Sequence, residues 1–597
     1  MSEVRANRVE RPSLQTETPL AWKSDIAAEM LRSLGIEFVA LNPGASYRGF
    51  HDSLVNYLGN DSPQMIMCLH EDHVVAIAHG YAKATDRPMG AVLHSNVGLM
   101  HGLMGIFNAF CDRMPMLIVG ATGPVMPEKR RPWIDWIHTT KDQAAMLRNY
   151  IKWDDEPRSA EGIVEAFLRG YQMTTTAPAA PVYICLDAGL QEESMSGSKL
   201  VIPDPSRYRA PEPPAATSAQ LGQVLDELTK AKKPLFLFGR GSRRQDHWDQ
   251  RVQLAELAGA SVFTSQHERA VFPTRHGLHV LEPMNTLTPA AKELFAESDL
   301  IVSFDFTDLQ GTLRQLNRNT SELVSRIVHV SLDQTLHNGW NMDYFGLPPV
   351  DVRIMADPDT AVGQICEGLA RRLNGKGLWD GVSRRKWVPM PYSADAGSKL
   401  SSSDIEVALA ELRGDRKISL SHLSFGWAGR SYHWDEPLDY LGHDGGAGLA
   451  AGPGLTIGAS LALSRQGRTV VCITGDGDFM QGASALWTAA HYSIPALFII
   501  SNNRSQFNDE IHQEAVAKTR SRLPENKWIG MRIDEPALDM AGIARAQGVE
   551  AEGPISTLAD LKAAIKRGFE AIDRGKPYLI DAVVTPGYAN KLVTRGD

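Results

Sequence analysis

The chain has few cysteines, no long apolar run and no excess of basic residues. Its five cysteines are spread over 597 residues and include no Cys-x-x-Cys pair, a usage typical of buried thiols in a reducing compartment. No run reaches the roughly 18 apolar residues that a membrane span needs, and the first twenty residues lack the apolar core of a signal peptide. We therefore expect a cytoplasmic protein that does not insert into a membrane.

The charge balance is mildly acidic. The chain carries 61 Lys and Arg against 70 Asp and Glu, a net charge of −9. This balance gives no general attraction for nucleic acid or for an anionic membrane surface, so we predict neither as a partner. An anionic ligand must therefore be held by a local site. At 597 residues and 43% hydrophobic content, the chain is typical of a globular protein with several domains.

Short apolar runs alternate with amphipathic stretches in three blocks, separated by segments rich in proline, serine and charge. This βα alternation predicts the α/β class, with a mainly parallel, Rossmann-like sheet in each block. The predicted organisation is an N-terminal arm at 1–20, α/β domains at 21–192, 216–372 and 403–597, and linkers at 193–215 and 373–402.

The sequence GDGD at Gly475 to Asp478 is the strongest chemical signal. The apolar run before it predicts a buried parallel strand, which places Asp476 at the carboxyl edge of a sheet, where ligands of such sheets bind. We expect a helix over 479–492 and a second strand that returns Asn503, 27 residues after Asp476, to the same edge.

Hard oxygen ligands would meet at that edge. The Asp476 carboxylate, the Asn503 amide and the backbone carbonyl of Ser505 suit an octahedral Mg²⁺, or Ca²⁺, that also binds diphosphate oxygens. The flanking Gly475 and Gly477 let backbone N–H groups approach the anion. A turn followed by an Asn-rich loop is the competing interpretation.

Two further features have both structural and functional interpretations. Glu71 follows an apolar strand and precedes a helical run, so it is either a helix N-terminal acid or a buried catalytic carboxylate. In the middle block, Gly239 and Gly241 follow a strand but lack the third glycine of a dinucleotide fingerprint. A structural glycine turn is favoured there, and FAD is not expected.

Several motifs together resemble one known family. They are NPG at Asn42 to Gly44, HED around Glu71, LHS at His94, FPTRH at 272–276, and GDGD with SALWTAAHYSIP. The chain resembles the thiamine diphosphate-dependent decarboxylase and acetolactate synthase superfamily over nearly its whole length, and within it is most similar to benzoylformate decarboxylase. The resemblance implies thiamine diphosphate as cofactor and a fold of pyrimidine-binding, middle and diphosphate-binding domains.

The resemblance also implies roles for single residues. Glu71 would hydrogen-bond N1′ of the aminopyrimidine, the Ala447 carbonyl would accept its 4′-amino group, Leu449 would bend the cofactor, and His94 would transfer protons near the reacting carbon. The other implied cofactor contacts are Asn42, Pro43, Gly44, Ser424, Gly475, Gly477, Asp478, Ser505 and Gln506. Relatives build the site from two subunits, so a homodimer is the expected minimal unit and a homotetramer the expected assembly.

The chain departs from benzoylformate decarboxylase at its polar substrate groups. Ala45 follows the NPG motif where that enzyme has a catalytic serine, and Ser46 comes one residue later. The second catalytic histidine of that enzyme should fall in the middle block near FDFTDLQGT at 304–312, where this sequence has no histidine. Candidates to replace these groups in a substrate pocket are Asp135, Trp136 and His138, whose segment could equally be an ordinary surface helix.

These observations predict an enzyme that cleaves a C–C bond next to a carbonyl in a small-molecule substrate, with 2-oxo acid decarboxylation as the leading interpretation. Carboligase or lyase chemistry of the acetolactate synthase or benzaldehyde lyase type remains open. Two different classes of protein also remain open, a non-catalytic cofactor-binding subunit and a nicotinamide or flavin oxidoreductase.

Overall fold

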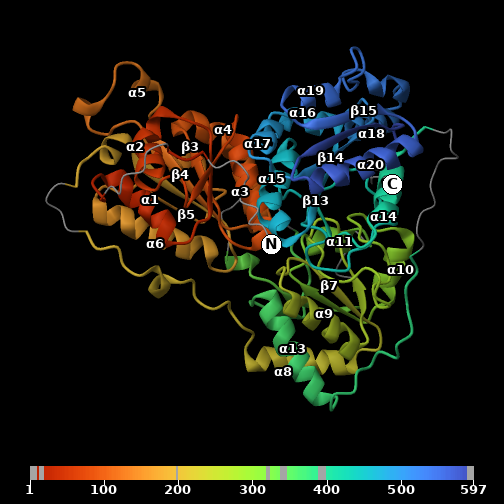
Figure 1. The fold of residues 1–597 in the computed structure, drawn as a ribbon. Helices are drawn as coiled ribbons and strands as arrows, with labels where there is room; N and C mark the ends of the chain where they lie inside the picture. The colour runs from red at the N-terminus through yellow and green to blue at the C-terminus, as the bar shows by residue number, and fades with distance from the viewer. Residues whose placement is uncertain are drawn as a thin grey trace.

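The computed structural model describes residues 10–12, 19–195, 200–316, 323–335, 346–387 and 399–587 (Figure 1). Most of the predicted N-terminal arm and part of each predicted linker lie outside these residues. The described residues form three sheets in which neighbouring strands pair in parallel, each flanked by helices. The α/β class and the three parallel sheets predicted from the sequence are therefore confirmed.

The N-terminal sheet has the strand order β2-β1-β3-β4-β6-β5. Helices α1 and α6 pack on one face, and α3 and α4 pack on the other. The strands are β1 Phe38–Leu41, β2 Gln64–Met67, β3 Gly90–Leu93, β4 Met116–Thr122, β5 Trp153–Asp155 and β6 Pro181–Asp187. The helices are α1 Lys23–Ser33, α2 Arg48–Asp52, α3 Glu71–Thr85, α4 Ser95–Cys111, α5 Ile134–Ile137, α6 Ala160–Thr175 and α7 Ala188–Gln191.

The middle sheet has the order β11-β10-β9-β7-β8. Its strands are β7 Pro234–Phe238, β8 Ser261–Phe263, β9 Leu300–Phe304, β10 Arg326–Val330 and β11 Val352–Ile354. Its helices are α8 Ser218–Lys230, α9 Gln245–Ala258, α10 Pro289–Glu297, α11 Leu309–Arg314 and α13 Pro358–Arg372.

The C-terminal sheet has the order β12-β13-β14-β16-β15. Its strands are β12 Ile418–His422, β13 Thr469–Gly475, β14 Ala496–Asn502, β15 Glu550–Ile555 and β16 Tyr578–Val583. Its helices are α14 Ser402–Leu412, α15 Ala451–Leu463, α16 Asp476–Gly482, α17 Ala485–His491, α18 Phe507–Thr519, α19 Met540–Ala546 and α20 Leu558–Asp573. The continuous helix predicted over 479–492 is wrong, because α16 and α17 are separate helices.

The N-terminal and C-terminal domains share one apolar core through helices α3 and α15, which lie side by side at the centre of Figure 1. Two glycines allow this close crossing. A Cβ atom added at Gly80 would lie 2.0 Å from the Leu455 carbonyl oxygen, and one at Gly458 would lie 1.9 Å from the Ile77 carbonyl oxygen. The backbones of the two helices therefore touch, which ties the two domains of one chain together.

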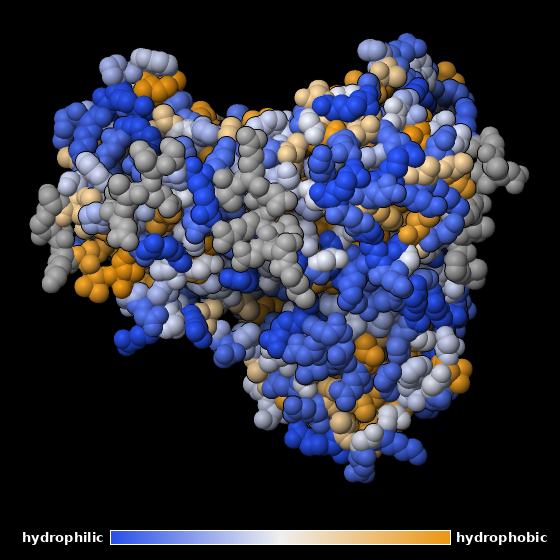
Figure 2. Space-filling view, viewed as in Figure 1, coloured by the Kyte–Doolittle hydropathy of each residue, from blue (hydrophilic) through white to orange (hydrophobic). Residues whose placement is uncertain are grey.

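Hydrophilic residues cover most of the face shown in Figure 2, and apolar residues occur there in smaller separate patches. Among the described residues, no helix has the length and hydropathy that would suit a bilayer crossing. Four of the five cysteines are buried, which fits the thiol environment expected from the sequence.

Candidate functional site

The carboxyl ends of β13 and β14 hold the predicted metal-ligating residues. The two strands are paired in parallel, with Gly475 opposite Ser501, so the segments that follow them emerge together. Asp476 Oδ2 and Asn503 Oδ1 both accept a hydrogen bond from the Ser505 backbone N–H, at 3.1 Å and 3.0 Å. The carboxylate, the amide and the Ser505 backbone thus lie at one point, as their order in the sequence predicted.

All the candidates from the third block line a single pocket of about 250 Å³. We call it the diphosphate pocket. The candidate residues that line it are Ser424, Ala447, Leu449, Gly475, Asp476, Gly477, Asp478, Asn503, Ser505 and Gln506.

One wall of the diphosphate pocket is a loop held in an unusual conformation. Ala447 and Ala450 have positive φ angles of 55° and 85°, which are costly for residues other than glycine. Asn108 of α4 supports the loop, because its Oδ1 accepts the backbone N–H groups of Gly446 and Gly448. The loop presents Leu449, 37% exposed, beside the pocket. An apolar side chain left in this position suits the predicted wedge against a cofactor.

The side chain of Asp478 is turned into the protein. Its carboxylate accepts hydrogen bonds from His422 Nε2 at 2.9 Å, Thr474 Oγ1 at 2.8 Å and the Ala450 backbone N–H at 2.7 Å. Asp478 and Asp444 raise the pKa of His422 against the opposing effect of burial. These three donors offset part of the Asp478 charge.

The electrostatics of the diphosphate pocket fit a divalent cation. The described residues that line it include Asp444, Asp476, Asp478 and Asp509 but no lysine or arginine. A diphosphate in this pocket would need a metal ion to offset its charge. Burial raises the pKa of Asp476 to about 6, because the carboxylate is held out of water. A hard cation beside these oxygen donors would remove that penalty.

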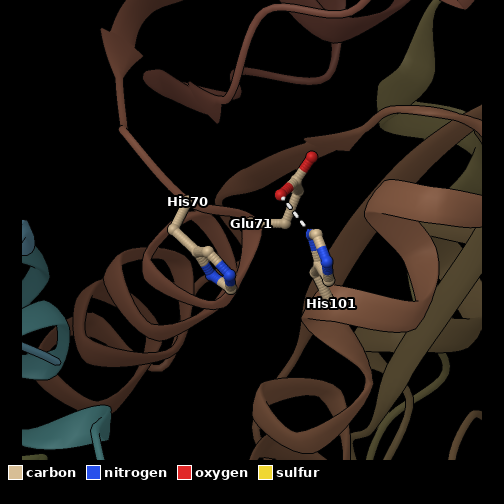
Figure 3. A group of neighbouring side chains, drawn as sticks. All are labelled: His70, Glu71 and His101. Carbon is tan, nitrogen blue, oxygen red and sulfur yellow. Dashed lines mark hydrogen bonds and ion pairs between the residues drawn. The ribbon is translucent and has the colours of Figure 1, made fainter. Parts of the chain in front are cut away.

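Glu71 begins helix α3 directly after β2, at the strand-to-helix corner expected from the sequence, and it is 5% exposed. Figure 3 shows its carboxylate directed toward His101 of α4, whose Nδ1 lies 3.1 Å from Glu71 Oε2. His70 stacks on His101, with ring centroids 4.9 Å apart. The contact to His101 was not predicted, and a spacing of thirty residues gives no signal for it.

His70, Glu71 and His101 are close enough to be considered as a metal site, with ligand atoms within 4.8 Å of one another. However, His70 Nδ1 accepts the Asp72 backbone N–H at 3.1 Å and caps helix α3. A neutral His70 therefore carries its proton on Nε2, and a metal on either nitrogen would disrupt this cap. The group is better explained as a cap beside a buried carboxylate.

His94 lies close to Glu71 and to the NPG motif. A Cβ atom added at Gly98 would lie 2.8 Å from Glu71 Oε1 and 3.1 Å from His94 Cβ, so both side chains border the same small space. A Cβ atom added at Gly44 would lie 2.5 Å from the His94 ring, so only glycine fits there. In the same motif, the Asn42 carbonyl accepts the Tyr47 hydroxyl, and Pro43 is exposed.

Ser46, not Ala45, faces His94. The 3₁₀ turn over Ala45–Tyr47 leaves Ala45 exposed and turns Ser46 inward, where its Oγ lies 2.8 Å from His94 Nδ1. The 3₁₀ turn thus directs Ser46 toward His94, although Ser46 comes one residue after the position expected for a serine.

The candidates Asp135, Trp136 and His138 have three different environments. Asp135 is buried and accepts hydrogen bonds from the Arg131 backbone and guanidinium, so its carboxylate holds the loop in place. Trp136 is 82% exposed. His138 packs edge-on against His94, with ring centroids 4.7 Å apart. The structure therefore brings only His138 of the three to His94, directly after the short, largely exposed helix α5.

Glu71 and His94 do not line the diphosphate pocket of the same chain. The candidate site is therefore in two parts, one on the N-terminal domain and one on the C-terminal domain.

The middle-block glycines have packing roles. A Cβ atom at Gly239 would lie 2.0 Å from the Asp305 carbonyl oxygen, and one at Gly241 would lie 2.7 Å from Arg251 Nη1.

Comparisons with known proteins match this architecture. Profiles of the thiamine pyrophosphate enzyme family match the chain over residues 22–146 for the N-terminal TPP binding domain, 221–365 for the central domain and 423–582 for the C-terminal TPP binding domain. The chain is 26% identical to benzoylformate decarboxylase of Pseudomonas aeruginosa, over 93% of this chain and 97% of that protein. It is 24% identical to the acetolactate synthase large subunit of Haemophilus influenzae, over 84% and 87%.

Solved structures share the fold. Benzoylformate decarboxylase from Polynucleobacter necessarius has a TM-score of 0.77 at 19% identity, covering 96% of this chain and 100% of that chain. A 4-hydroxybenzoylformate decarboxylase of Rhodococcus jostii has a TM-score of 0.73 at 21% identity, with the same coverage. With matches to all three of its domains in order along the sequence, the chain belongs to the thiamine pyrophosphate enzyme family.

Proposed function

We propose that this protein is a thiamine diphosphate- and Mg²⁺-dependent lyase that decarboxylates a 2-oxo acid, with a homodimer as its active unit. The observation that carries the proposal is the division of the site. The candidate metal-ligating oxygens gather in the diphosphate pocket, whereas the buried acid Glu71 and the imidazole of His94 lie together on the N-terminal domain.

Each residue has a task that follows from its surroundings. When bound, thiamine diphosphate supplies the nucleophilic carbon and the electron sink for the departing carboxylate. Asp476, Asn503 and Ser505 would hold the metal, and Leu449 would support the cofactor between the two domains. Glu71 is dry enough to hold a proton at N1′ of the cofactor, because a carboxylate in water would have little influence there.

We propose a dimer because Glu71 and His94 of one chain do not line the diphosphate pocket of that same chain. The exposed Leu449 and the exposed side chain of His101 beside Glu71 mark the two surfaces that a second copy would cover. A symmetric pair would place the Glu71 surface of each chain over the diphosphate pocket of its partner, which gives two equivalent sites. A homotetramer would pair two such dimers.

The test is a steady-state assay on the full chain with benzoylformate, pyruvate and benzoin as separate substrates. CO₂ and aldehyde are both measured, with and without thiamine diphosphate and Mg²⁺. We expect a 2-oxo acid to give equal amounts of CO₂ and aldehyde only when both cofactors are present. Formation of CO₂ together with a hydroxyketone in place of aldehyde would identify a carboligase. Formation of aldehyde from benzoin without CO₂ would identify a lyase of the benzaldehyde lyase type. Bound cofactor without any turnover would refute the proposal.

A further inference from the structure

Ser46, His94 and His138, which we call the histidine cluster, form a continuous polar group on the N-terminal domain. Ser46 Oγ accepts the Ser95 backbone N–H at 3.1 Å. Its hydroxyl hydrogen is then available to His94 Nδ1 at 2.8 Å, the acceptor that the described residues offer it. With Ser46 as the donor, His94 accepts at Nδ1 and, when neutral, carries its proton on Nε2. Ser46 fixes which nitrogen of His94 can donate.

The His138 ring packs against His94, and one nitrogen of this ring lacks a hydrogen-bond partner among the described residues. Its Nδ1 atom is buried without a partner among the described residues. The segment just before it is held by the ion pair of Arg131 with Asp135 and by the Asn96 side-chain amide, which donates to the Ile137 carbonyl at 3.1 Å. A buried polar atom without a partner is costly and calls for an explanation. Here the structure holds an imidazole in place at that cost.

The charges around His94 limit how many protons the cluster can hold. The carboxylate of Glu71 raises the pKa of His94, whereas burial, His138 and Arg131 lower it, and the net direction is downward. With ring centroids 4.7 Å apart, a proton on one imidazole opposes a proton on the other. The two rings are therefore electrostatically coupled.

We propose that His138 is a second catalytic imidazole of this enzyme, that it works with His94 on the substrate carbonyl group, and that Ser46 is a positioning residue for His94. The inference rests on the proposed decarboxylase function. Conversion of a 2-oxo acid to CO₂ and an aldehyde consumes one proton, which ends on the carbon that lost its carboxylate. The carbonyl oxygen also gains a proton during addition and loses it on release.

These two transfers occur at different atoms, so two proton carriers are useful. One imidazole supplies the proton that stays on carbon and is recharged from water. The other gives a proton to the oxygen and takes it back, with no net change. His138 thus supplies the second proton carrier from the same domain as His94.

The test compares His138→Gln, His94→Gln and Ser46→Ala in the full-length enzyme with thiamine diphosphate and Mg²⁺. Lys141→Gln is the matched control, because Lys141 is an exposed residue on the same segment. We expect His138→Gln to lower kcat by roughly 100-fold, the scale of a lost general acid or base, with little change in KM or in cofactor affinity. The control should match wild type. Wild-type kcat in His138→Gln would overturn the proposal.

A second measurement separates this inference from the proposed function. NMR titration of ¹³C-labelled histidine follows His94 directly, with His94→Gln identifying its resonance. His138 lowers the pKa of His94 in the wild-type protein, so the pKa of His94 should rise in His138→Gln. An unchanged pKa would refute the coupling even if kcat fell. If wild type released no CO₂ from any 2-oxo acid, the proposed function would fail, and the titration would still decide whether the two rings are coupled.

Discussion

Gly98 in helix α4 offers a sharp test of how Glu71 is positioned. In Gly98→Ala, the new Cβ atom would lie 2.8 Å from Glu71 Oε1, about 0.6 Å inside the 3.4 Å at which ordinary contact begins. The end of a side chain can move by this amount, at a cost of about 0.5–1.5 kcal/mol if it leaves its rotamer. Alanine in a helix interior stabilises the folded protein by about 0.5–1 kcal/mol relative to glycine. Stability should therefore change little.

Activity should respond much more strongly than stability. A displacement near 1 Å can cost about 100-fold in rate, so the shift of the Glu71 carboxylate should lower kcat by about 10- to 100-fold. The assay is steady-state decarboxylation alongside thermal unfolding. Gly222→Ala in α8 is the control, because nothing lies within 4 Å of its added Cβ. It should keep full activity and gain up to about 1 kcal/mol. Wild-type kcat in Gly98→Ala would show that the Glu71 geometry is not critical.

Three further substitutions test the rest of the site and its support. Glu71→Gln keeps an acceptor for His101 but no acid, so the unfolding curve should stay unchanged while turnover falls by about 10²- to 10⁴-fold; near-normal turnover would contradict the role of Glu71. Asp476→Asn removes a ligand charge, so calorimetry should find Mg²⁺-dependent thiamine diphosphate binding weakened by more than about tenfold, and an equal affinity would exclude Asp476 as a ligand. Gly458→Ala places Cβ 1.9 Å from the Ile77 carbonyl oxygen, and denaturant unfolding should reveal a loss of about 3–5 kcal/mol; a loss below about 1 kcal/mol would mean that the two helices can separate.

The sequence alone was sufficient to predict that the candidate metal-ligating residues lie together. Asp476 and Asn503 each follow a buried strand, and parallel neighbours end at the same sheet edge, so the spacing of the strands determined that these side chains meet. The position of Glu71 at a strand-to-helix corner was predictable for the same local reason.

Local signals failed where distant segments make contact. The helix predicted over 479–492 is interrupted after Gly482, where an added Cβ would lie 2.2 Å from the Ala450 carbonyl oxygen of the loop that begins α15. A close approach between segments about thirty residues apart leaves no trace in helical periodicity.

The motifs determined the family, the three α/β sheets and the residues of the diphosphate pocket, because these depend on strand order and on short-range spacing. Only the tertiary structure decided that Ser46 and not Ala45 faces His94, that His101 contacts Glu71 and that His138 packs on His94. Each of these contacts joins separate loops and helices, and their geometry is set by packing across the domain, which no local pattern of residues encodes.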